Sequence, residues 1–498
     1  MNDILSNVVL GLSVALSWQG LLYCAFGVVM GMIVGVLPGL GALAAISILF
    51  PVTYHIEPGF ALIMIAGIYY GTSYGGKITA ILMNVPGETD AAVICLDGYP
   101  MARQGRAGVA LLLTTLAAFG GAAIGIVITI IFSPAISKVA LAFGSPEYFA
   151  LMTLGLFATT AMSDSAASKS LGMAAFGIVL GLVGVDVDSG ADRFTFGLLT
   201  LKDGISLVVV AMGVFGVAEL IMSYNSKMLP VNSVTMRSML PTRDDLRRIV
   251  SPILRGTGVG AFFGALPGTG ATVSTFIAYG LERGVAKDKS RFGKGAVEGL
   301  TAPEAAANSA SITSFIPTLM LGVPGSASMA LILSLLIVHG IAPGPRLILD
   351  HPQVVWGLIM SFWVGNLILV ILNIPLIGVW VRLLRIPTSY MYPMIMMFIS
   401  IGTYSIRLNV VDVGLVVLSG LFGIWARRAG FPLGPLLLGY VLGPLLEEHF
   451  RRTLVLSGGD PAAFISSKLA MVVYAIILFL SVWKIRARMR NRKPVALS

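Results

Sequence analysis

Four ionisable side chains stand in stretches of sequence that are otherwise apolar and rich in glycine. Lys77, Glu88 and Asp90 lie close together in one stretch, and Glu304 lies in a second. If these stretches cross a membrane, a charge within them is costly and indicates a functional site. Lys77 could bind the carboxylate of a ligand or pair with one of these acids. The acids are candidates for protonation or cation binding, or each is a helix N-terminal charge stabilised by the helix dipole.

Polar side chains accompany these charges in two related motifs, at residues 69–93 and 303–330. Each motif contains Ile-Thr and then Val-Pro-Gly, which should interrupt a helix and let it restart. The first turn of a restarted helix presents free N–H groups and a positive dipole end, and both favour an anion. The predicted ligand-binding residues here are Lys77, Thr79, Asn84, Pro86, Gly87, Asn308, Ser309, Thr313, Pro324, Gly325 and Ser326. For the serines and threonines, ordinary hydrogen bonding between helices is an equal alternative, whereas for Asn84 and Asn308 we favour a binding role.

A second pair of motifs places Pro-Gly-x-Gly after a run with glycine at every fourth position. Residues 27–42 and 256–271 match with a separation of 229 positions, so the chain contains an internal repeat. Glycines four apart lie on one helix face and let a neighbouring helix approach closely. Unwound backbone within a membrane survives only where it is buried in protein or lines a cavity, and broken helices in matching places of two repeats indicate a binding site. The predicted binding positions of this pair are Pro38, Gly39, Gly41, Pro267, Gly268 and Gly270. The alternative is a proline kink with glycine packing and no ligand.

The composition sets the class of protein that must position these residues. Of the 498 residues, 56% are hydrophobic and 11% are charged, whereas soluble domains carry about 25% charged residues. The apolar runs are longer than the ~10-residue strands of a membrane β-barrel. We therefore predict an all-α polytopic membrane protein with roughly 11–13 membrane segments, some of them discontinuous.

The distribution of basic residues predicts the organisation of the chain. We expect a first membrane repeat at 1–224, a basic cytoplasmic linker at 225–255, a second repeat core at 256–352, membrane helices at 353–483 and a basic cytoplasmic tail at 484–498. Within the linker, Thr242 should open a short amphipathic helix.

The same distribution predicts orientation. No Lys or Arg precedes Lys77, so the N-terminus should face the periplasm and the C-terminal tail the cytoplasm. The loop after the first Pro-Gly-x-Gly has no basic residue and the loop after the second has five. This difference predicts inverted-topology repeats, which place a substrate site between them at the membrane midplane.

Other classes of function find little support. The net charge of +10 lies in loops and the tail, where topology and the lipid bilayer account for it, so no nucleic-acid partner is expected. Cys24 and Cys95 form neither a metal set nor a disulfide framework, and we expect no metal or other cofactor. No nucleophile with a base and no nucleotide-binding loop is present, so we do not expect an enzyme.

Taken together, the motifs resemble the large membrane subunit of the tripartite tricarboxylate transporters, which are bacterial secondary carriers. The matching residues are 35–41, 69–88, 264–270, 302–310, 316–333, 339–345 and 432–452, which cover essentially the whole chain. One departure is Lys77, where the resemblance leads us to expect a small hydroxyl residue.

The resemblance implies a multi-pass protein of the bacterial inner membrane that works with a small integral membrane subunit and a periplasmic solute-binding protein. It implies symport of di- or tricarboxylates with Na⁺ or H⁺, for which Glu88, Asp90 and Glu304 are the coupling candidates. An elevator-like movement of a domain built from both motif pairs would follow by analogy. The alternative is a solute or ion channel that is indifferent to gradients and uses the backbone of the broken helices.

Overall fold

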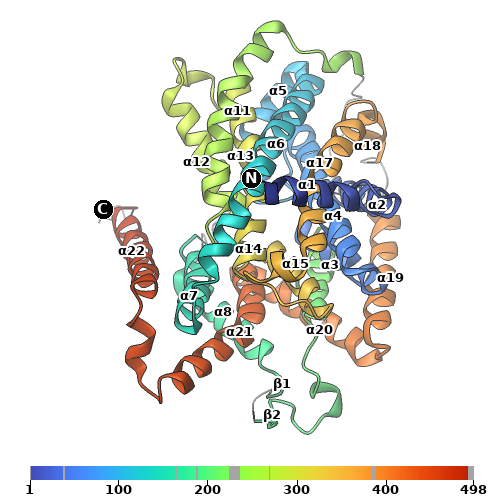
Figure 1. Cartoon of the computed structure of the whole chain (residues 1–498). Coiled ribbons are helices and arrows are strands. Elements are labelled where there is room, and N and C mark those ends of the chain that lie inside the picture. The colour runs from blue at the N-terminus through green and yellow to red at the C-terminus, as the bar shows by residue number, and fades with distance from the viewer. Residues whose placement is uncertain are drawn as a thin grey trace, which may run out of the picture. The chain divides into compact units, whose positions relative to one another are not determined.

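The computed structural model describes residues 2–37, 40–162, 165–186, 189–223, 236–267, 270–383 and 388–491. These residues are mostly helical (Figure 1), and within them the only strands are β1 Gly184–Val185 and β2 Asp192–Arg193, an antiparallel pair. The chain divides into two compact units, which are described separately. Unit 1 comprises 1–138 and 206–425, and unit 2 comprises 139–205 and 426–498.

Unit 1 contains both copies of the repeat motifs. Its first part has α1 Asn2–Ala15, α2 Trp18–Gly35, α3 Ala42–Leu49, α4 Pro58–Met83, α5 Ala91–Met101 and most of α6 Ala107–Ala140. Its second part has α9 Leu207–Ala211, α10 Ala218–Ser223, α11 Arg243–Gly264, α12 Gly270–Val285, α13 Val297–Thr313, α14 Phe315–Met320, α15 Ala327–Val338 and α16 Leu347–Asp350. The remaining helices are α17 Pro352–Asn373, α18 Ile377–Leu383, α19 Thr388–Arg407 and α20 Val410–Arg428, which reaches unit 2 at its end.

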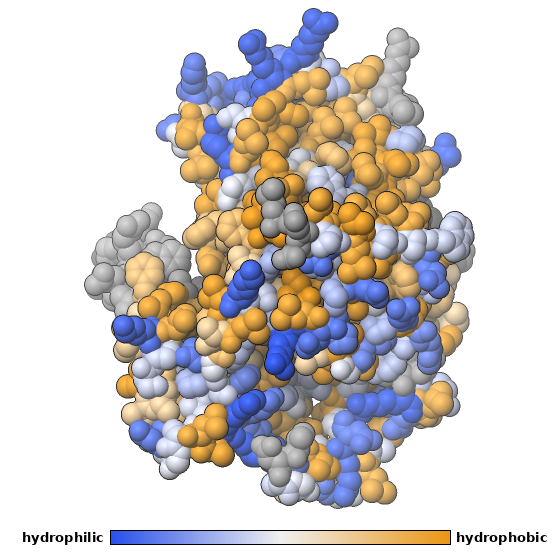
Figure 2. Space-filling model, viewed as in Figure 1, coloured by the Kyte–Doolittle hydropathy of each residue, from blue (hydrophilic) through white to orange (hydrophobic). Residues whose placement is uncertain are grey.

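The apolar helices confirm the prediction of an all-α polytopic membrane protein. Within the described residues, four helical stretches are long and apolar enough to cross a membrane: Trp18–Gly35, Ala91–Ala140, Pro352–Asn373 and Val410–Arg428. Shorter apolar helices of 10–17 residues accompany them. Phe262, Leu367, Ile371 and Leu418 are each more than half exposed, and Figure 2 shows broad hydrophobic areas on the visible face. The number of membrane segments stays a prediction.

The glycine stripes form two closely packed helix pairs, α2 with α4 and α11 with α13. A Cβ atom built at Gly31 would lie 2.8 Å from the Cα of Ile68, and one at Gly260 would lie 2.8 Å from the Cα of Ala306. Real Cβ atoms do not approach backbone this closely, so only glycine allows these contacts. The glycine pattern of the sequence therefore predicted which face of α2 and of α11 packs against a neighbouring helix.

The helices end where the proline–glycine motifs predicted breaks. The first repeat is interrupted between Gly35 and Ala42, and the second between Gly264 and Gly270. α4 then ends at Met83 and is followed by Asn84, whose φ of 58° is left-handed, and the chain restarts as α5. In the second repeat the longer spacing before Val-Pro-Gly is taken up by the additional short helix α14.

The predicted short amphipathic helix of the linker needs a correction. Thr242 does cap a helix, because its hydroxyl accepts the N–H of Asp245 and the Asp245 carboxylate accepts the N–H of Thr242. However, this helix is α11, which continues for 22 residues into the second glycine stripe. It continues because no glycine–proline break separates the two segments, and Pro252 lies inside the helix without ending it.

Unit 2 is built from α7 Ser145–Met162, α8 Ala167–Gly181, α21 Gly434–Leu456, α22 Lys468–Asn491 and the β1–β2 hairpin. Gly177 and Gly439 bring α8 and α21 together through backbone contacts. In the hairpin, Asp186 pairs with Arg193 at 2.7 Å and with Arg451 at 2.9 Å. The pair with Arg451 connects the hairpin to α21.

Candidate functional site

Lys77 is buried near the C-terminal end of α4, with its side chain 2% exposed. Its Nζ donates a hydrogen bond of 2.7 Å to Oδ2 of Asp90 and lies 3.8 Å from Oε2 of Glu304. The second distance is too long for a hydrogen bond but short enough for a strong electrostatic attraction in a buried site. Of the partners that the sequence offered, Lys77 therefore pairs with Asp90 and Glu304.

Glu304 is fully buried inside α13 and is held by Asn308 from the next turn. The Asn308 Nδ2 donates to Oε1 of Glu304 at 2.8 Å and to the Glu304 carbonyl at 3.0 Å. This arrangement leaves Oε2 of Glu304 buried without a hydrogen-bond partner among the described residues, and Oδ1 of Asp90 is in the same condition. Such buried acceptors are unusual and call for an explanation.

Glu88 has a different partner from the other two acids. Its Oε1 accepts a very short hydrogen bond from the backbone N–H of Ala42, the first residue of α3. A carboxylate at a helix N-terminus is stabilised by the free N–H groups and by the helix dipole. The structure thus gives Glu88 the helix-end position that the sequence offered as its alternative.

The charged residues meet because the two repeats exchange contacts. α5, which restarts after the first Val-Pro-Gly, packs against α13 of the second repeat, and α15, which restarts after the second, packs against α4 of the first. Lys77 comes from α4, Asp90 precedes α5 and Glu304 comes from α13. The resulting cluster of Lys77, Asp90 and Glu304 is called the ion triad below.

The broken segments of each repeat also approach one another. A Cβ built at Gly41 would lie 3.1 Å from the Gly87 carbonyl, and one at Gly270 would lie 3.7 Å from the Gly325 carbonyl. The hydroxyls of Thr89 and Thr272 lie 2.7 Å apart and join the Val-Pro-Gly segment of the first repeat to α12 of the second. Pro38, Gly39 and Gly268 lie outside the described residues, whereas Pro267, Pro324 and Gly325 are buried.

The predicted polar residues divide into those that bond locally and those that do not. The Thr79 hydroxyl donates to the Gly76 carbonyl at 2.9 Å, and the Thr313 hydroxyl donates to the Ser309 carbonyl at 3.0 Å. Ser326 caps α15 by accepting the Met329 N–H. The following predicted residues have other surroundings: the Ser309 hydroxyl is buried and unpartnered among the described residues, and Asn84 and Pro86 are exposed.

Sequence reasoning missed Asp97 in α5, which binds the loop between α12 and α13. Its Oδ1 accepts the N–H groups of Gly293, Gly295 and Ala296 at 2.7–2.9 Å, and Tyr279 donates to its Oδ2 at 3.0 Å. Gly293 and Gly295 have φ of 79° and 98°, which is why glycine stands at both places. The sequence signal that could have indicated this contact was the pair of glycines, Gly293 and Gly295, in a basic loop.

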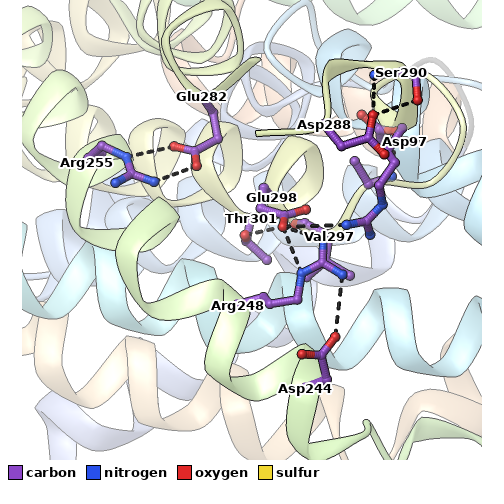
Figure 3. Close-up of polar contacts among 12 residues, drawn as sticks. Asp97, Asp244, Arg248, Arg255, Glu282, Asp288, Ser290, Val297, Glu298 and Thr301 are labelled. Atoms are coloured by element: carbon purple, nitrogen blue, oxygen red, sulfur yellow. Dashed lines mark hydrogen bonds and ion pairs between the residues drawn. The ribbon is translucent and has the colours of Figure 1, made fainter. Parts of the chain in front are cut away.

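Two arginine–glutamate pairs connect α11 to its neighbours α12 and α13 (Figure 3). Arg255 binds both carboxylate oxygens of Glu282 in α12, at 2.6 and 3.0 Å, and Arg248 binds Glu298 in α13 at 2.8 Å through Nε. Paired arginines and carboxylates of this kind position helices, and each of these carboxylates is bound by an arginine. The ion triad differs, because one lysine there faces two acids.

Tyr69 is a further contact between the repeats that the sequence did not reveal. Its hydroxyl bonds to that of Ser311 in α13 at 3.1 Å. In the described part of the chain, no group of three or more His, Cys, Asp or Glu side chains is placed to hold a metal ion.

Comparisons with known proteins find a family and two relatives. A model of the tripartite tricarboxylate transporter TctA family matches residues 21–438. An uncharacterised 52.8 kDa protein from the TAR-I ttuC' 3' region of Agrobacterium vitis is 44% identical over 494 residues, which is 99% of this chain and 98% of that protein. A second uncharacterised protein, from the TAR-II ttuC' 3' region of the same organism, is 44% identical over 47% of this chain and 97% of its own length. No solved structure matches.

The family match confirms the resemblance drawn from the motifs. The family consists of components of a transporter, and the apolar helices make this chain a multi-pass membrane protein. The chain belongs to the tripartite tricarboxylate transporter TctA family.

Proposed function

We propose that this protein is the large subunit of a secondary active transporter that imports small organic acids, of the di- or tricarboxylate type, with a cation gradient. The observation that carries the proposal is the ion triad. A buried lysine lies between two buried acids where the helices that restart after both Val-Pro-Gly breaks pack against the opposite repeat.

The triad offers the chemistry that a carboxylate needs. An ammonium group has three N–H donors, and Lys77 donates one hydrogen bond within the described residues, to Asp90. The other donors suit the oxygens of a substrate carboxylate. A substrate held there competes with Asp90 for Lys77, so binding is strong enough to select an anion and weak enough to release it.

The two helices that restart after the Val-Pro-Gly breaks add to this preference. α15, a helix of 12 residues, begins directly after Val-Pro-Gly, and α5, with 11 residues, begins after Asp90. Their N-termini present free N–H groups and positive dipole ends. Asn308, one turn after Glu304 on α13 and bonded to it, would orient the ligand; the unpartnered hydroxyl of Ser309 lies on the same helix.

The family name states that the transporter has three parts, so we propose two partners for this chain. A small integral membrane subunit shares the bacterial inner membrane with it, and a periplasmic solute-binding protein delivers the substrate. By the distribution of Lys and Arg, the N-terminus faces the periplasm and the basic tail faces the cytoplasm. The two repeats then have opposite orientations.

Reconstitution tests the proposal. Proteoliposomes would contain this chain and its small partner, with the binding protein outside, loaded with labelled citrate, succinate or tartrate. Uptake that accumulates label, and that requires both the binding protein and an imposed Na⁺ or proton gradient, supports the proposal. Downhill flux that ignores the gradient and the binding protein would favour a channel instead.

A further inference from the structure

The ion triad contains one positive and two negative side chains, and all three are buried. The side chains of Lys77, Asp90 and Glu304 are 2%, 4% and 0% exposed. With all groups ionised, the triad has a net charge of −1. A buried charge that lacks a partner is strongly unfavourable, so the triad needs one further positive charge to be neutral.

The geometry decides which cation can supply that charge. Lys77 Nζ already lies between the acids, 2.7 Å from one oxygen of Asp90 and 3.8 Å from one oxygen of Glu304. A metal ion between the same acids would face the like charge of the ammonium group at close range. A proton adds almost no volume and binds to a single oxygen. Oε2 of Glu304 is such an oxygen, since it is buried and has no hydrogen-bond partner in the described residues.

From this geometry, and resting on the proposed transport function, we propose that Lys77 is a tethered cation that takes the place of a coupling metal ion, and that a proton carried by Glu304 couples substrate import. Glu304 is the better proton carrier of the two acids, because Asp90 receives the direct hydrogen bond of Lys77. Asn308 donates to Oε1 of Glu304, which leaves Oε2 for the proton.

Several other groups face the triad from the elements packed around it. Among the described residues, none of these groups is a second cation. They are Tyr69 and Tyr74 on α4, Glu88 in the segment before α5, Cys95 on α5 and Asn308 on α13. Glu88 is a further acid that faces Asp90 and Lys77, and its contact with the N–H of Ala42 lies at a helix end, where a negative charge is favoured. The net charge of the triad counts Lys77, Asp90 and Glu304 alone.

The coupling between proton binding and substrate binding follows from the net charge of the ion triad. With Glu304 ionised, the triad carries −1 and repels a carboxylate; with Glu304 protonated, the triad is neutral and Lys77 can bind the anion. Proton and substrate therefore favour each other's binding, and the coupling is reciprocal. One proton binds from the periplasmic side with the substrate, and the same proton is released to the cytoplasm after the substrate leaves. No covalent bond of the substrate changes.

The test measures proton entry during uptake. Proteoliposomes with the small subunit, a pH dye inside and the membrane potential clamped at zero would receive binding protein loaded with labelled citrate, succinate and tartrate together. We expect the wild-type lumen to acidify as label enters, without Na⁺. Glu304→Gln should lose this acidification. Glu282→Gln is the matched control, since it makes the same change in a buried carboxylate that Arg255 neutralises, and it should keep the acidification.

A second variant should gain Na⁺ binding. Lys77→Ser removes the tethered cation, so Na⁺ should raise the melting temperature of this variant and leave that of the wild type unchanged, whether or not the variant still carries substrate; a variant that Na⁺ does not stabilise would overturn this inference. Wild-type uptake that needs Na⁺ and brings no acid inside would overturn this inference and leave the proposed transport function standing. The same holds if Glu304→Gln still acidifies the lumen. Absence of uptake under every gradient would overturn the proposed function, and the inference with it.

Discussion

Replacing Gly260 by alanine should destabilise the protein, because this glycine lets α11 approach the backbone of α13. A Cβ there would lie 2.8 Å from both the Cα and the carbonyl carbon of Ala306. These are backbone atoms, which cannot turn away as a side chain can, so the two helices must separate. Forcing an extra methyl into a packed interior costs about 1–3 kcal/mol. We expect the upper part of this range, because the contact repeats at Gly256 and Gly264 on the same face.

Gly258 provides the matched control, because it lies in the same helix and a Cβ there would meet nothing within 4 Å. Alanine at this position should stabilise α11 by about 0.5–1 kcal/mol through helix propensity. The two alanine variants should therefore differ in unfolding free energy by about 2–4 kcal/mol. Thermal unfolding of the purified variants in one detergent, followed by tryptophan fluorescence, measures the difference. Equal melting temperatures for Gly260→Ala and Gly258→Ala would refute the packing argument.

Three further predictions concern polar contacts. Asp97→Asn should cost about 1.5–3 kcal/mol, as hydrogen bonds to a charged group do, and should speed hydrogen exchange in the loop that Asp97 binds; unchanged exchange would contradict it. Burial alone would raise the pKa of Asp245, but hydrogen bonds led by that of Arg106 hold this pKa below its usual range. The stabilising contact is therefore present above pH about 3.9 and lost as the pH falls further, so Asp245→Asn should lower the melting temperature at neutral pH and lose this effect in acid. Asn84→Ala and Asn308→Ala should each abolish uptake at normal expression, and normal uptake in both would remove them from the site.

The sequence predicted the packing faces of α2 and α11 and the breaks after them, because that information is local. Glycine at every fourth position defines a helix face on its own, and Pro-Gly interrupts a helix wherever it stands. The ends of α2 at Gly35 and of α11 at Gly264 follow from these two rules. The internal match of residues 27–42 with 256–271 showed that both places belong to one repeated unit.

Such local rules could not predict which charged side chains pair with one another. Lys77 had three acids within its reach in the sequence, and only the exchange of contacts between α5 and α13 brings Glu304 to it. That exchange depends on how two repeats pack, which no local pattern encodes. Asp97 was missed for the same reason, because its partners are three amides of a distant loop.

The central claim is that the ion triad is the place where a carboxylate is carried. The double variant Lys77→Gln with Asp90→Asn tests it most directly, since it removes the cation and one acid together and leaves the net charge of the triad at −1. Glu304 then has no ammonium partner, but it can become neutral by binding a proton, so the fold should persist, as a melting curve near that of the wild type would show. Binding-protein-dependent uptake of labelled citrate, succinate and tartrate by this variant is the measurement. We predict that uptake is lost, and uptake at the wild-type rate would contradict the account.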